Sequence, residues 1–422
     1  MESNLKVDYL ILGGGIAGTT AAEIIRQRSS GSVMIVTDDA HTLYSRVRLP
    51  DYVAGSIPRE KVFVKGEAWY KEQRIDLVRE TAVIALSPSD RSVTLSNGKK
   101  IQYGKLLLAT GGKARKLEFE GPEKEGVYTF RTLEDAERIK EAMANSKKAV
   151  VLGGGYIGLE LVRCSIQHGL ATCLVVMENQ FWPQALDEVS SKMVENALRK
   201  KGVEVYFQSQ IQTVMGNGKV ESIILSEASG SSGTERGVRG RQCFDCDFLG
   251  IGIGVTTMDP FIETSGLQIK KGILTDETLK TTDANIYAAG DVAEFYDPNG
   301  RKHYQFGNWV NAAGQGKVAG MNMTGDHQIF HSVSSYAIRL FGLSIGFSGE
   351  TKNEPGTTVI RRGSPEEGYV RLFVRDGKVK GASLINRAHE MRPVLEMIRK
   401  EIQVNHKESD LGNTDFELDS LF

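Results

Sequence analysis

Glycine residues recur at a matched spacing in two segments of the 422-residue chain, Val7–Gln27 and Lys147–Gln167. Each segment is a short apolar run followed by the pattern GxGxxG and then by a helical pattern. The first glycine of such a motif permits a tight turn from strand to helix, the second lets the backbone approach a pyrophosphate, and the third lets the helix pack closely on the strand. The six motif glycines are Gly13, Gly15, Gly18, Gly153, Gly155 and Gly158.

An acidic residue follows each glycine motif at the same distance. Asp38 and Glu178 both lie 20 residues beyond the third glycine, each after a second apolar run. A carboxylate at the end of that run can bind ribose hydroxyls, while the helix N-terminus offers unpaired N–H groups to the phosphates. Two such copies in one chain predict two bound dinucleotides.

If the second copy binds a nicotinamide coenzyme, its acid also bears on the choice between NADH and NADPH. Glu178 would repel the 2′-phosphate of NADPH, and no Arg or Lys stands between Glu178 and Ser190 to hold that phosphate. The sequence therefore favours NADH. When the second copy is aligned by its Trp182-Pro183 pair, however, Val176 and not Glu178 stands at the position where the acid is expected.

The cysteines give a weaker indication of chemistry. Cys243 and Cys246 form a CxxC pattern, which is found in redox disulfides and in half of a zinc site. In a strand, however, residues i and i+3 point to opposite faces, and no second CxxC or histidine pair completes a metal site. The sequence therefore favours two small apolar residues at the start of a strand, and it predicts no metal site.

The overall composition excludes several classes of protein. The chain has 52 Lys plus Arg against 53 Asp plus Glu, so a net charge of −1 gives no general attraction to nucleic acid or to an anionic membrane. No apolar stretch reaches the roughly 18 residues needed to span a bilayer. Only four cysteines in 422 residues argue against a secreted, disulfide-stapled fold, so we expect a cytoplasmic protein.

Further strands and helices are expected around the two motifs. Val203–Phe207 reads as a strand after the helical pattern Glu188–Lys201. Buried strands are expected in Lys105–Lys113, Cys246–Val255 and Asn285–Phe295.

The last part of the chain has a different sequence pattern from the two motif segments. Tyr369–Asn386 reads as two strands around an Asp-Gly turn, and the helical pattern that follows is expected to break near Pro393. The polar segment Ser226–Gln242 is expected to be a solvated loop, and the acidic, aperiodic end of the chain a loose tail.

Taken together, these motifs resemble those of the flavoproteins with two dinucleotide-binding domains, the pyridine nucleotide-disulfide oxidoreductase-like family. The resemblance covers about residues 7–385 and includes ATGG at Ala109–Gly112 and TTDANIYAAGD at Thr281–Asp291. The segment Tyr44–Gly55, which resembles the family's flavin-covering segment, has Asp51 where ferredoxin-reductase relatives have a lysine. Within the family the chain therefore most resembles the rubredoxin reductases and the flavin portion of NADH-dependent nitrite reductases.

This resemblance implies an α/β fold with two Rossmann-like domains. A FAD-binding domain, residues 1–114 and 247–325, would be split by an inserted NAD(P)H-binding domain, residues 115–246. A small C-terminal α/β domain, residues 326–422, would cap the flavin or form the interface of a homodimer, and would carry the loose acidic tail.

The resemblance also implies roles for individual residues. Glu160 would lie beside the nicotinamide, Tyr156 would gate its pocket, and Trp309 would begin a helix that points at the flavin; the alternatives are a helix-start acid and two packing aromatic residues. The predicted cofactor-binding residues are Gly13, Gly15, Ile16, Ala17, Gly18, Asp38, Arg46, Ala109, Thr110, Gly111, Gly153, Gly155, Tyr156, Ile157, Gly158, Glu178, Gly254, Gly290, Asp291 and Trp309.

The implied function is the transfer of hydride from NADH to FAD, and of electrons onward to a small acceptor protein such as rubredoxin or a ferredoxin. Thiol-reducing relatives have a cysteine in the flavin-covering segment, and this chain has none before Cys164. Two alternatives remain open: an NADH oxidase or disulfide reductase without the usual cysteine, and a non-metabolic flavoprotein that signals or acts as a scaffold.

Overall fold

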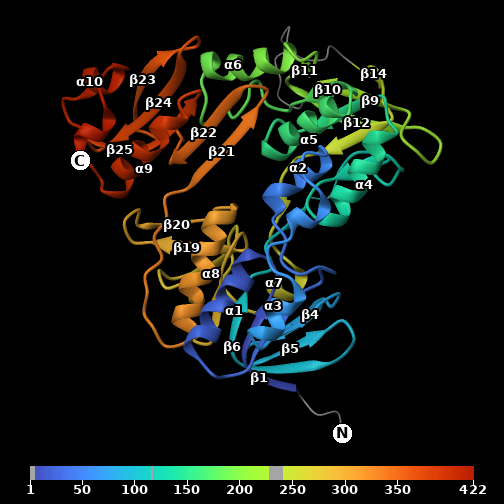
Figure 1. Cartoon of the computed structure of the whole chain (residues 1–422), viewed down its shortest axis with the longest axis vertical. Helices are drawn as coiled ribbons and strands as arrows, with labels where there is room; N and C mark the ends of the chain where they lie inside the picture. Colours follow the sequence, from blue (N-terminus) through green and yellow to red (C-terminus); the bar gives the residue numbers. More distant parts are fainter. Residues whose placement is uncertain (1–4, 116, 228–240) are drawn as a thin grey trace. The chain divides into compact units, whose positions relative to one another are not determined.

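The computed structural model describes residues 5–115, 117–227 and 241–422 (Figure 1). The chain forms two compact units. The first consists of Met1–Arg48, Pro58–Lys113 and Val255–Ser332, and the second of Leu49–Ile57, Ala114–Gly254 and Val333–Phe422. In the described part of the chain, no helix is both long enough and apolar enough to cross a membrane.

The first unit is built on a mainly parallel sheet in the order β3-β2-β1-β6-β5-β4, with β18 paired to β6. Its central strands β1 and β6 run parallel, and residues such as Leu10 and Leu106 are fully buried. The strands are β1 (Leu5–Leu12), β2 (Val33–Val36), β3 (Ile75–Val78), β4 (Val83–Ser87), β5 (Ser92–Leu95), β6 (Lys100–Leu108) and β18 (Ile286–Ala288). A parallel sheet with a helix after β1 is the arrangement that the first glycine motif predicted.

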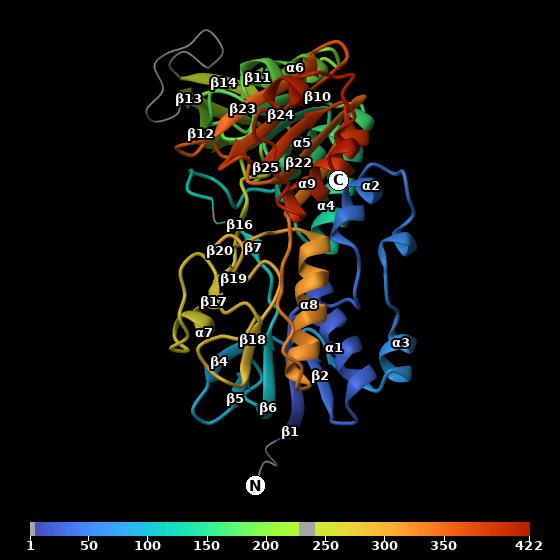
Figure 2. The same ribbon diagram turned by 90° about the vertical axis from the view of Figure 1, so that its left-hand side faces the viewer.

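Two helices, α1 (Ile16–Arg28) and α8 (Trp309–Met323), lie side by side along this sheet (Figure 2). Glycines make the approach possible, because a Cβ atom at Gly316 would overlap the carbonyl oxygen of Ala17. The remaining elements of this unit are η1 (Arg46–Arg48), η2 (Arg59–Val62), α3 (Glu67–Glu72), β16 (Val255–Thr256), α7 (Pro260–Glu263), β17 (Ile273–Thr275), β19 (Ala293–Asp297) and β20 (Lys302–Tyr304). The strand β7 (Lys113–Ala114) stands where the chain passes from one unit to the other.

The second unit contains a fully parallel sheet in the order β11-β10-β9-β15-β8. Its strands are β8 (Val127–Thr129), β9 (Lys148–Leu152), β10 (Ala171–Val175), β11 (Glu204–Tyr206) and β15 (Phe248–Ile251). The helices of this part are α2 (Leu49–Val53), α4 (Leu133–Ala144), α5 (Tyr156–Gln167) and α6 (Glu188–Arg199). The strand, glycine motif and helix predicted for the second copy are therefore present as β9 and α5.

The second unit also contains a three-stranded antiparallel sheet, whose strands lie between β11 and β15 in the sequence. It consists of β12 (Ser209–Met215), β13 (Ser222–Glu227) and β14 (Gln242–Asp245). The loop predicted for Ser226–Gln242 falls mostly on residues 228–240, which lie outside the described residues.

The C-terminal part of the second unit is a five-stranded antiparallel sheet in the order β21-β22-β25-β24-β23. The predicted Asp-Gly hairpin is confirmed, because Asp376 and Gly377 both have positive φ angles, 53° and 69°, between β24 and β25. The strands are β21 (Ser335–Leu340), β22 (Leu343–Gly349), β23 (Thr358–Ser364), β24 (Gly368–Arg375) and β25 (Lys378–Ile385). Whether this part is a domain of its own stays a prediction, as do the other predicted boundaries.

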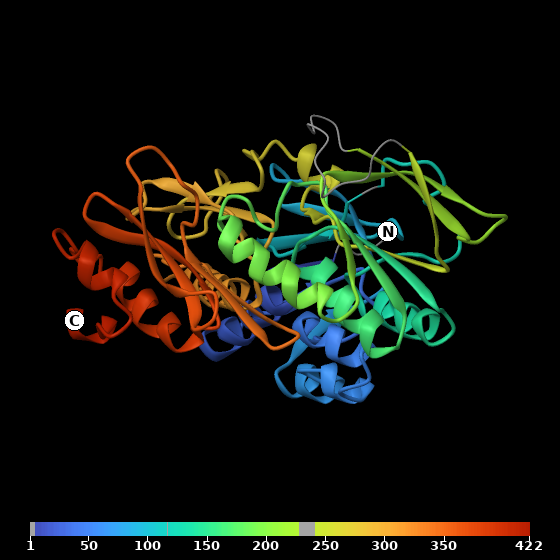
Figure 3. The same ribbon diagram turned by 90° about the horizontal axis from the view of Figure 1, so that it is seen from above.

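The end of the chain corrects two expectations. The helix α9 (Met391–Arg399) is not broken at Pro393, because that proline lies in the first turn, where its missing N–H group costs no helical hydrogen bond. The tail is not loose either. The tail, residues 407–422, forms α10 (Glu408–Gly412) and η4 (Leu418–Leu421) next to the C-terminal sheet (Figure 3), and η3 (Ala388–Glu390) precedes α9.

Two kinds of contact hold the tail in place. Leu411 and Leu418 are 0% and 3% exposed and belong to the apolar core under the sheet. The guanidinium group of Arg362, on β23, pairs with Glu390 at 3.0 Å and donates a hydrogen bond to the carbonyl oxygen of Phe416 at 2.7 Å. These contacts join residues far apart in the sequence, which is why the tail's own composition did not reveal them.

We predict that Leu418→Ala lowers the free energy of unfolding of the protein by about 2–5 kcal/mol, because it removes a buried side chain and leaves a cavity. The matched control is Phe422→Ala in the same tail. Phe422 is 41% exposed, so its loss should cost less than about 1 kcal/mol. Urea unfolding followed by circular dichroism measures both. Equal, small effects would show that the tail does not contribute to the core.

Candidate active site with two dinucleotide motifs

At two of the three glycines of the first motif, backbone atoms lie so close that a side chain would not fit. Gly13 has a φ of +112°, and a Cβ atom there would overlap the carbonyl oxygen of Ala109. A Cβ atom at Gly18 would overlap the carbonyl oxygen of Gly13. At Gly15, the N-cap of α1, no described atom lies within 4 Å of a Cβ position. The open space is therefore at the one glycine that the motif reserves for a pyrophosphate.

Buried polar atoms beside this motif also fit a bound polar group. The side-chain hydroxyl of Thr110, next to Ala109, is buried and has no hydrogen-bond partner among the described residues. On α8, Gln315 accepts a hydrogen bond from the N–H group of Gly290 at 2.7 Å, while its own Nε2 atom is buried without a partner in the described chain. Buried polar groups are rarely left unpaired in proteins, so these atoms are suited to contacts with a cofactor such as FAD.

The other predicted FAD residues lie in the same unit. Asp38 follows β2 by two residues and is 63% exposed, with the Lys113 ammonium 4.0 Å from its carboxylate. Ile16 and Ala17 form the first turn of α1, and Gly290 lies against Ala17, with a Cβ position 3.2 Å from the Ala17 Cβ. Gly111 has a φ of +71° in the turn after β6.

Three further residues of this group lie near the ends of elements. Asp291 follows Gly290, and its carbonyl oxygen accepts a hydrogen bond from Gln305 at 2.8 Å. Trp309 is the first residue of α8 and is half-buried. Arg46 lies 3.8 Å from the carboxylate of Asp39, a residue that sequence reasoning did not select. Asp39 also accepts a hydrogen bond from the hydroxyl of Tyr44 at 2.9 Å.

The second glycine motif repeats the geometry of the first. Gly153 has a φ of +110°, and a Cβ atom there would overlap the carbonyl oxygen of Gly252. A Cβ atom at Gly158 would overlap the carbonyl oxygen of Gly153, whereas no described atom lies within 4 Å of a Cβ position at Gly155. Gly254 has a φ of +96° and is in the loop after β15. The second unit thus offers the same open position at the N-terminus of a helix.

The structure places the two candidates for the ribose-binding position differently. Val176 directly follows β10 and is buried, with a Cβ position at Gly154 3.0 Å from its Cγ1 atom. Glu178 lies three residues beyond β10 and is exposed. The role of Glu178 stays a prediction, and an exposed carboxylate at this edge has room to meet a ribose.

Glu160 and its neighbours form a charged cluster on α5. The carboxylate of Glu160 is 2.6 Å from the Nε atom of Arg163, and the Arg163 guanidinium is 3.0 Å from the carboxylate of Asp51. Burial raises the pKa of Glu160, and Arg163 partly offsets this. Sequence reasoning missed Arg163, although its i,i+3 spacing from Glu160 on a predicted helix could have indicated the pair.

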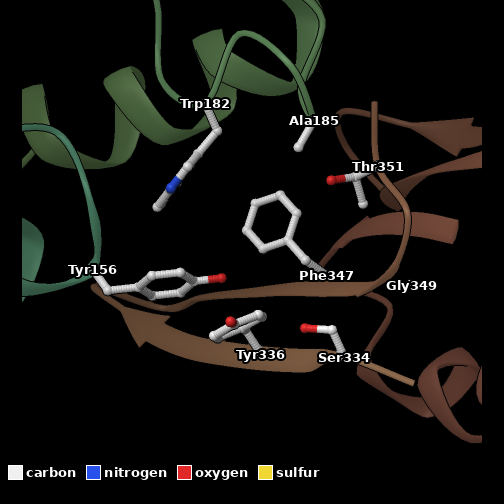
Figure 4. A pocket seen from close by; sticks show the side chains of 8 residues that line it. All are labelled: Tyr156, Trp182, Ala185, Ser334, Tyr336, Phe347, Gly349 and Thr351. Atoms are coloured by element: carbon white, nitrogen blue, oxygen red, sulfur yellow. The ribbon is translucent and has the colours of Figure 1, made fainter. Parts of the chain in front are cut away.

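Tyr156, the first residue of α5, is held among three other aromatic rings (Figure 4). Its ring stacks on Tyr336 at 5.5 Å between centroids and meets Trp182 at 5.5 Å and the edge of Phe347 at 6.2 Å. Together with Ala185, Ser334, Gly349 and Thr351 these rings line a small pocket. Ile157, the next residue, is 39% exposed.

The two cysteines of the CxxC pattern differ in exposure, and only the first lies in a strand, whereas both were predicted at the start of one. Cys243 is exposed on β14 and Cys246 is buried just after it, and neither forms a disulfide. Burial raises the pKa of Cys246 and of Cys164 to about 12, so both are protonated thiols at neutral pH. A protonated, buried thiol is a poor nucleophile, which argues against thiol chemistry at these two positions.

We predict that Gly15→Val abolishes FAD binding, because the added methyl groups would occupy the open space at the first motif. The matched variant is Gly155→Val, which should retain FAD and lose NADH binding. Absorbance of the purified proteins measures FAD, and fluorescence titration measures NADH. Gly66→Val is a control, because Gly66 is also a helix N-cap with open space around its Cβ position. Stoichiometric FAD in the Gly15 variant would show that the first motif is assigned wrongly.

Comparison with known proteins agrees with this geometry. Residues 7–316 match the model of the pyridine nucleotide-disulphide oxidoreductase family. The chain is 27% identical to the NADH-rubredoxin oxidoreductase of Clostridium acetobutylicum, over 89% of this chain and 90% of that protein. It is 28% identical to the ferredoxin–NAD(+) reductase component of 3-phenylpropionate/cinnamic acid dioxygenase from Photorhabdus laumondii, over 94% of this chain and 97% of that protein.

A solved structure shows the same fold. The crystal structure of a ferredoxin reductase from Rhodopseudomonas palustris superposes with a TM-score of 0.86 at 24% identity, covering 99% of both chains. The predicted α/β fold with two dinucleotide motifs is thereby confirmed. The chain belongs to the pyridine nucleotide-disulphide oxidoreductase family and is an oxidoreductase.

Proposed function

We propose that the chain transfers electrons from NADH, through FAD, to a small redox protein of the rubredoxin or ferredoxin type. The main support for the proposal is the pair of glycine motifs. In each motif, backbone atoms leave no room for a Cβ atom at the first and third glycine, whereas the space at the second glycine is free. Two relatives are named for rubredoxin and ferredoxin reduction, which supports an acceptor of this kind. When bound, FAD supplies the chemistry of accepting two electrons together and releasing them singly.

The residues of the chain bind and orient the two cofactors. The N-termini of α1 and α5, at Gly15 and Gly155, present unpaired N–H groups and a positive dipole end to the phosphates. Glu160 is half-buried, and its carboxylate would orient the carboxamide of the nicotinamide. A fixed negative charge there also favours the positive ring that is left when hydride departs.

A small redox protein fits the cysteines better than a disulfide substrate does. Cys164 and Cys246 are buried and protonated, and Cys243 is a single exposed thiol. A disulfide reductase needs a reactive thiolate at the flavin to pass electrons to sulfur. We further propose a cytoplasmic location, since a reducing compartment keeps an exposed thiol such as Cys243 unpaired.

The direct test of this function is a comparison of acceptors. The NADH-reduced protein is mixed without air with rubredoxin or with a [2Fe–2S] ferredoxin, and separately with oxygen. We expect at least one of the two proteins to be reduced faster than oxygen is consumed. Reaction with oxygen alone would identify an oxidase, and no reaction with any acceptor would favour a signalling or scaffold role; either result overturns the proposal.

We predict that the protein prefers NADH over NADPH. The exposed carboxylate of Glu178 would repel the 2′-phosphate of NADPH, and the sequence has no cation between Glu178 and Ser190 to bind it. The ratio of kcat/KM for the two coenzymes measures the preference, and Glu178→Gln should narrow it. A ratio near one in the unmodified protein would contradict the assignment of Glu178.

We also predict that the double variant Cys243→Ser, Cys246→Ser keeps NADH-dependent activity within a few-fold. Some loss of stability is expected, because the hydroxyl placed at the buried position of Cys246 needs a hydrogen-bond partner. A reductive titration should consume two electrons per chain in both proteins. If the unmodified protein takes up four electrons and the variant two, the CxxC pair is a redox centre.

A further inference from the structure

Arg163 connects two carboxylates that belong to different segments of the second unit. It pairs with Glu160 on the same helix, α5, at 2.6 Å and with Asp51 on α2 at 3.0 Å. The side chains of Glu160 and Arg163 are only 21% and 15% exposed, whereas Asp51 is 47% exposed. A guanidinium group suits this position, because its separate N–H groups can bind two acceptors at once.

The same face of α5 binds α2 through two further contacts. The thiol of Cys164 donates a hydrogen bond to the carbonyl oxygen of Pro50 at 3.3 Å. A ring nitrogen of His168 lies 2.8 Å from the carbonyl oxygen of Val53. Residues 160, 163, 164 and 168 follow the i, i+3, i+4 spacing of one helical face. The short helix α2 is therefore attached to α5 along a line that starts at Glu160.

A half-buried carboxylate needs a partner to stay both charged and fixed. Burial raises the pKa of Glu160, Asp51 raises it slightly further, and Arg163 lowers it through its charge and its hydrogen bond. Gln167, one turn further along α5, accepts a third hydrogen bond from the guanidinium group at 3.3 Å and limits its rotation. Arg163 is thus the cation in direct contact with the Glu160 carboxylate, and its own guanidinium group is held by two further acceptors.

We propose that Arg163 is the positioning residue for Glu160: it holds that carboxylate ionised and oriented for the nicotinamide, and through Asp51 it couples the carboxylate to α2. The role rests on the proposed function, because it assumes that Glu160 meets the nicotinamide. Asp51 lies on α2, so the guanidinium group of Arg163 on α5 stands between the two carboxylates.

The first test is the pH dependence of flavin reduction by NADH. In Arg163→Gln the carboxylate loses its cation, so its pKa rises and it becomes protonated at a higher pH. The acid limb of kcat/KM for NADH should therefore move upward by about one pH unit or more. Asp51→Asn removes a negative charge near Glu160. In this variant the acid limb of the kcat/KM profile should therefore stay in place or move to lower pH. An unshifted limb in Arg163→Gln would overturn the proposal.

Two further variants separate positioning from general damage. Arg163→Lys keeps the charge, so its acid limb should stay close to that of the unmodified protein. In a Glu160→Gln background the carboxylate is absent, and adding Arg163→Gln should change kcat/KM by less than about two-fold. A loss in the double variant as large as in Arg163→Gln alone would show that Arg163 acts on something other than Glu160.

The second readout does not depend on the bound cofactors or on activity. Hydrogen exchange in the segment Leu49–Ile57 should speed up in both Arg163→Gln and Asp51→Asn, because each breaks the ion pair between α2 and α5. Arg138→Gln is the matched control, since Arg138 forms a similar i,i+3 pair with Asp135 on α4 at 2.7 Å. Equal exchange in all of these proteins would overturn the coupling to α2.

These outcomes also separate this inference from the proposed function. If the unmodified protein binds FAD and is not reduced by NADH, the proposed function fails, while the exchange data still test the tie between α2 and α5. If the unmodified protein is reduced normally and Arg163→Gln has the same pH profile, only the role of Arg163 fails.

Discussion

The structure depends on a close backbone approach that occurs twice, between a helix and the end of the strand before it. At Gly18 and at Gly158 a single added Cβ atom would overlap the carbonyl oxygen of the first motif glycine. Because the helices α1 and α5 are held so close, their N-termini face the turn, and free space remains at the middle glycine. The helix α8 approaches α1 in the same way, because Gly316 packs directly against the carbonyl oxygen of Ala17.

The helix α5 combines three tasks within four turns. Its N-terminus faces the open position at Gly155, its first side chain packs among the rings of the C-terminal sheet, and its third turn contacts α2 through Arg163. Because all three contacts belong to one helix, α5 connects the open position at Gly155, the C-terminal sheet and α2 inside the second unit. Tyr156 and Glu160 lie about one turn apart on this helix, so both residues are near its N-terminus.

Local patterns in the sequence predicted local structure well. Glycine spacing located both strand–turn–helix units, and the Asp-Gly pair located the hairpin at Asp376, because these features depend on backbone conformations that few residues adopt. The ordered tail could not be predicted this way. Its anchors, Leu411 and Leu418, are too sparse to show a period, and Arg362 is about 50 residues away from the carbonyl groups that it binds.

The candidate site shows the same limit. The motif glycines were found because their spacing is short and specific. The contacts of Arg163 with Asp51 and of Tyr156 with Tyr336 join residues 112 and 180 positions apart, and no local pattern reports such contacts. Val176 illustrates a different difficulty, because it lies one residue and Glu178 three residues beyond the end of β10, and the sequence alone does not show where the strand ends.

We expect each unit of the chain to hold one dinucleotide of its own kind. Native mass spectrometry of the purified protein, before and after addition of NAD⁺, tests it most directly. We expect one FAD per chain at the start and a further mass of one NAD⁺ per chain afterwards, with FAD retained. A chain that carries two FAD molecules, or that loses FAD when NAD⁺ binds, would contradict it.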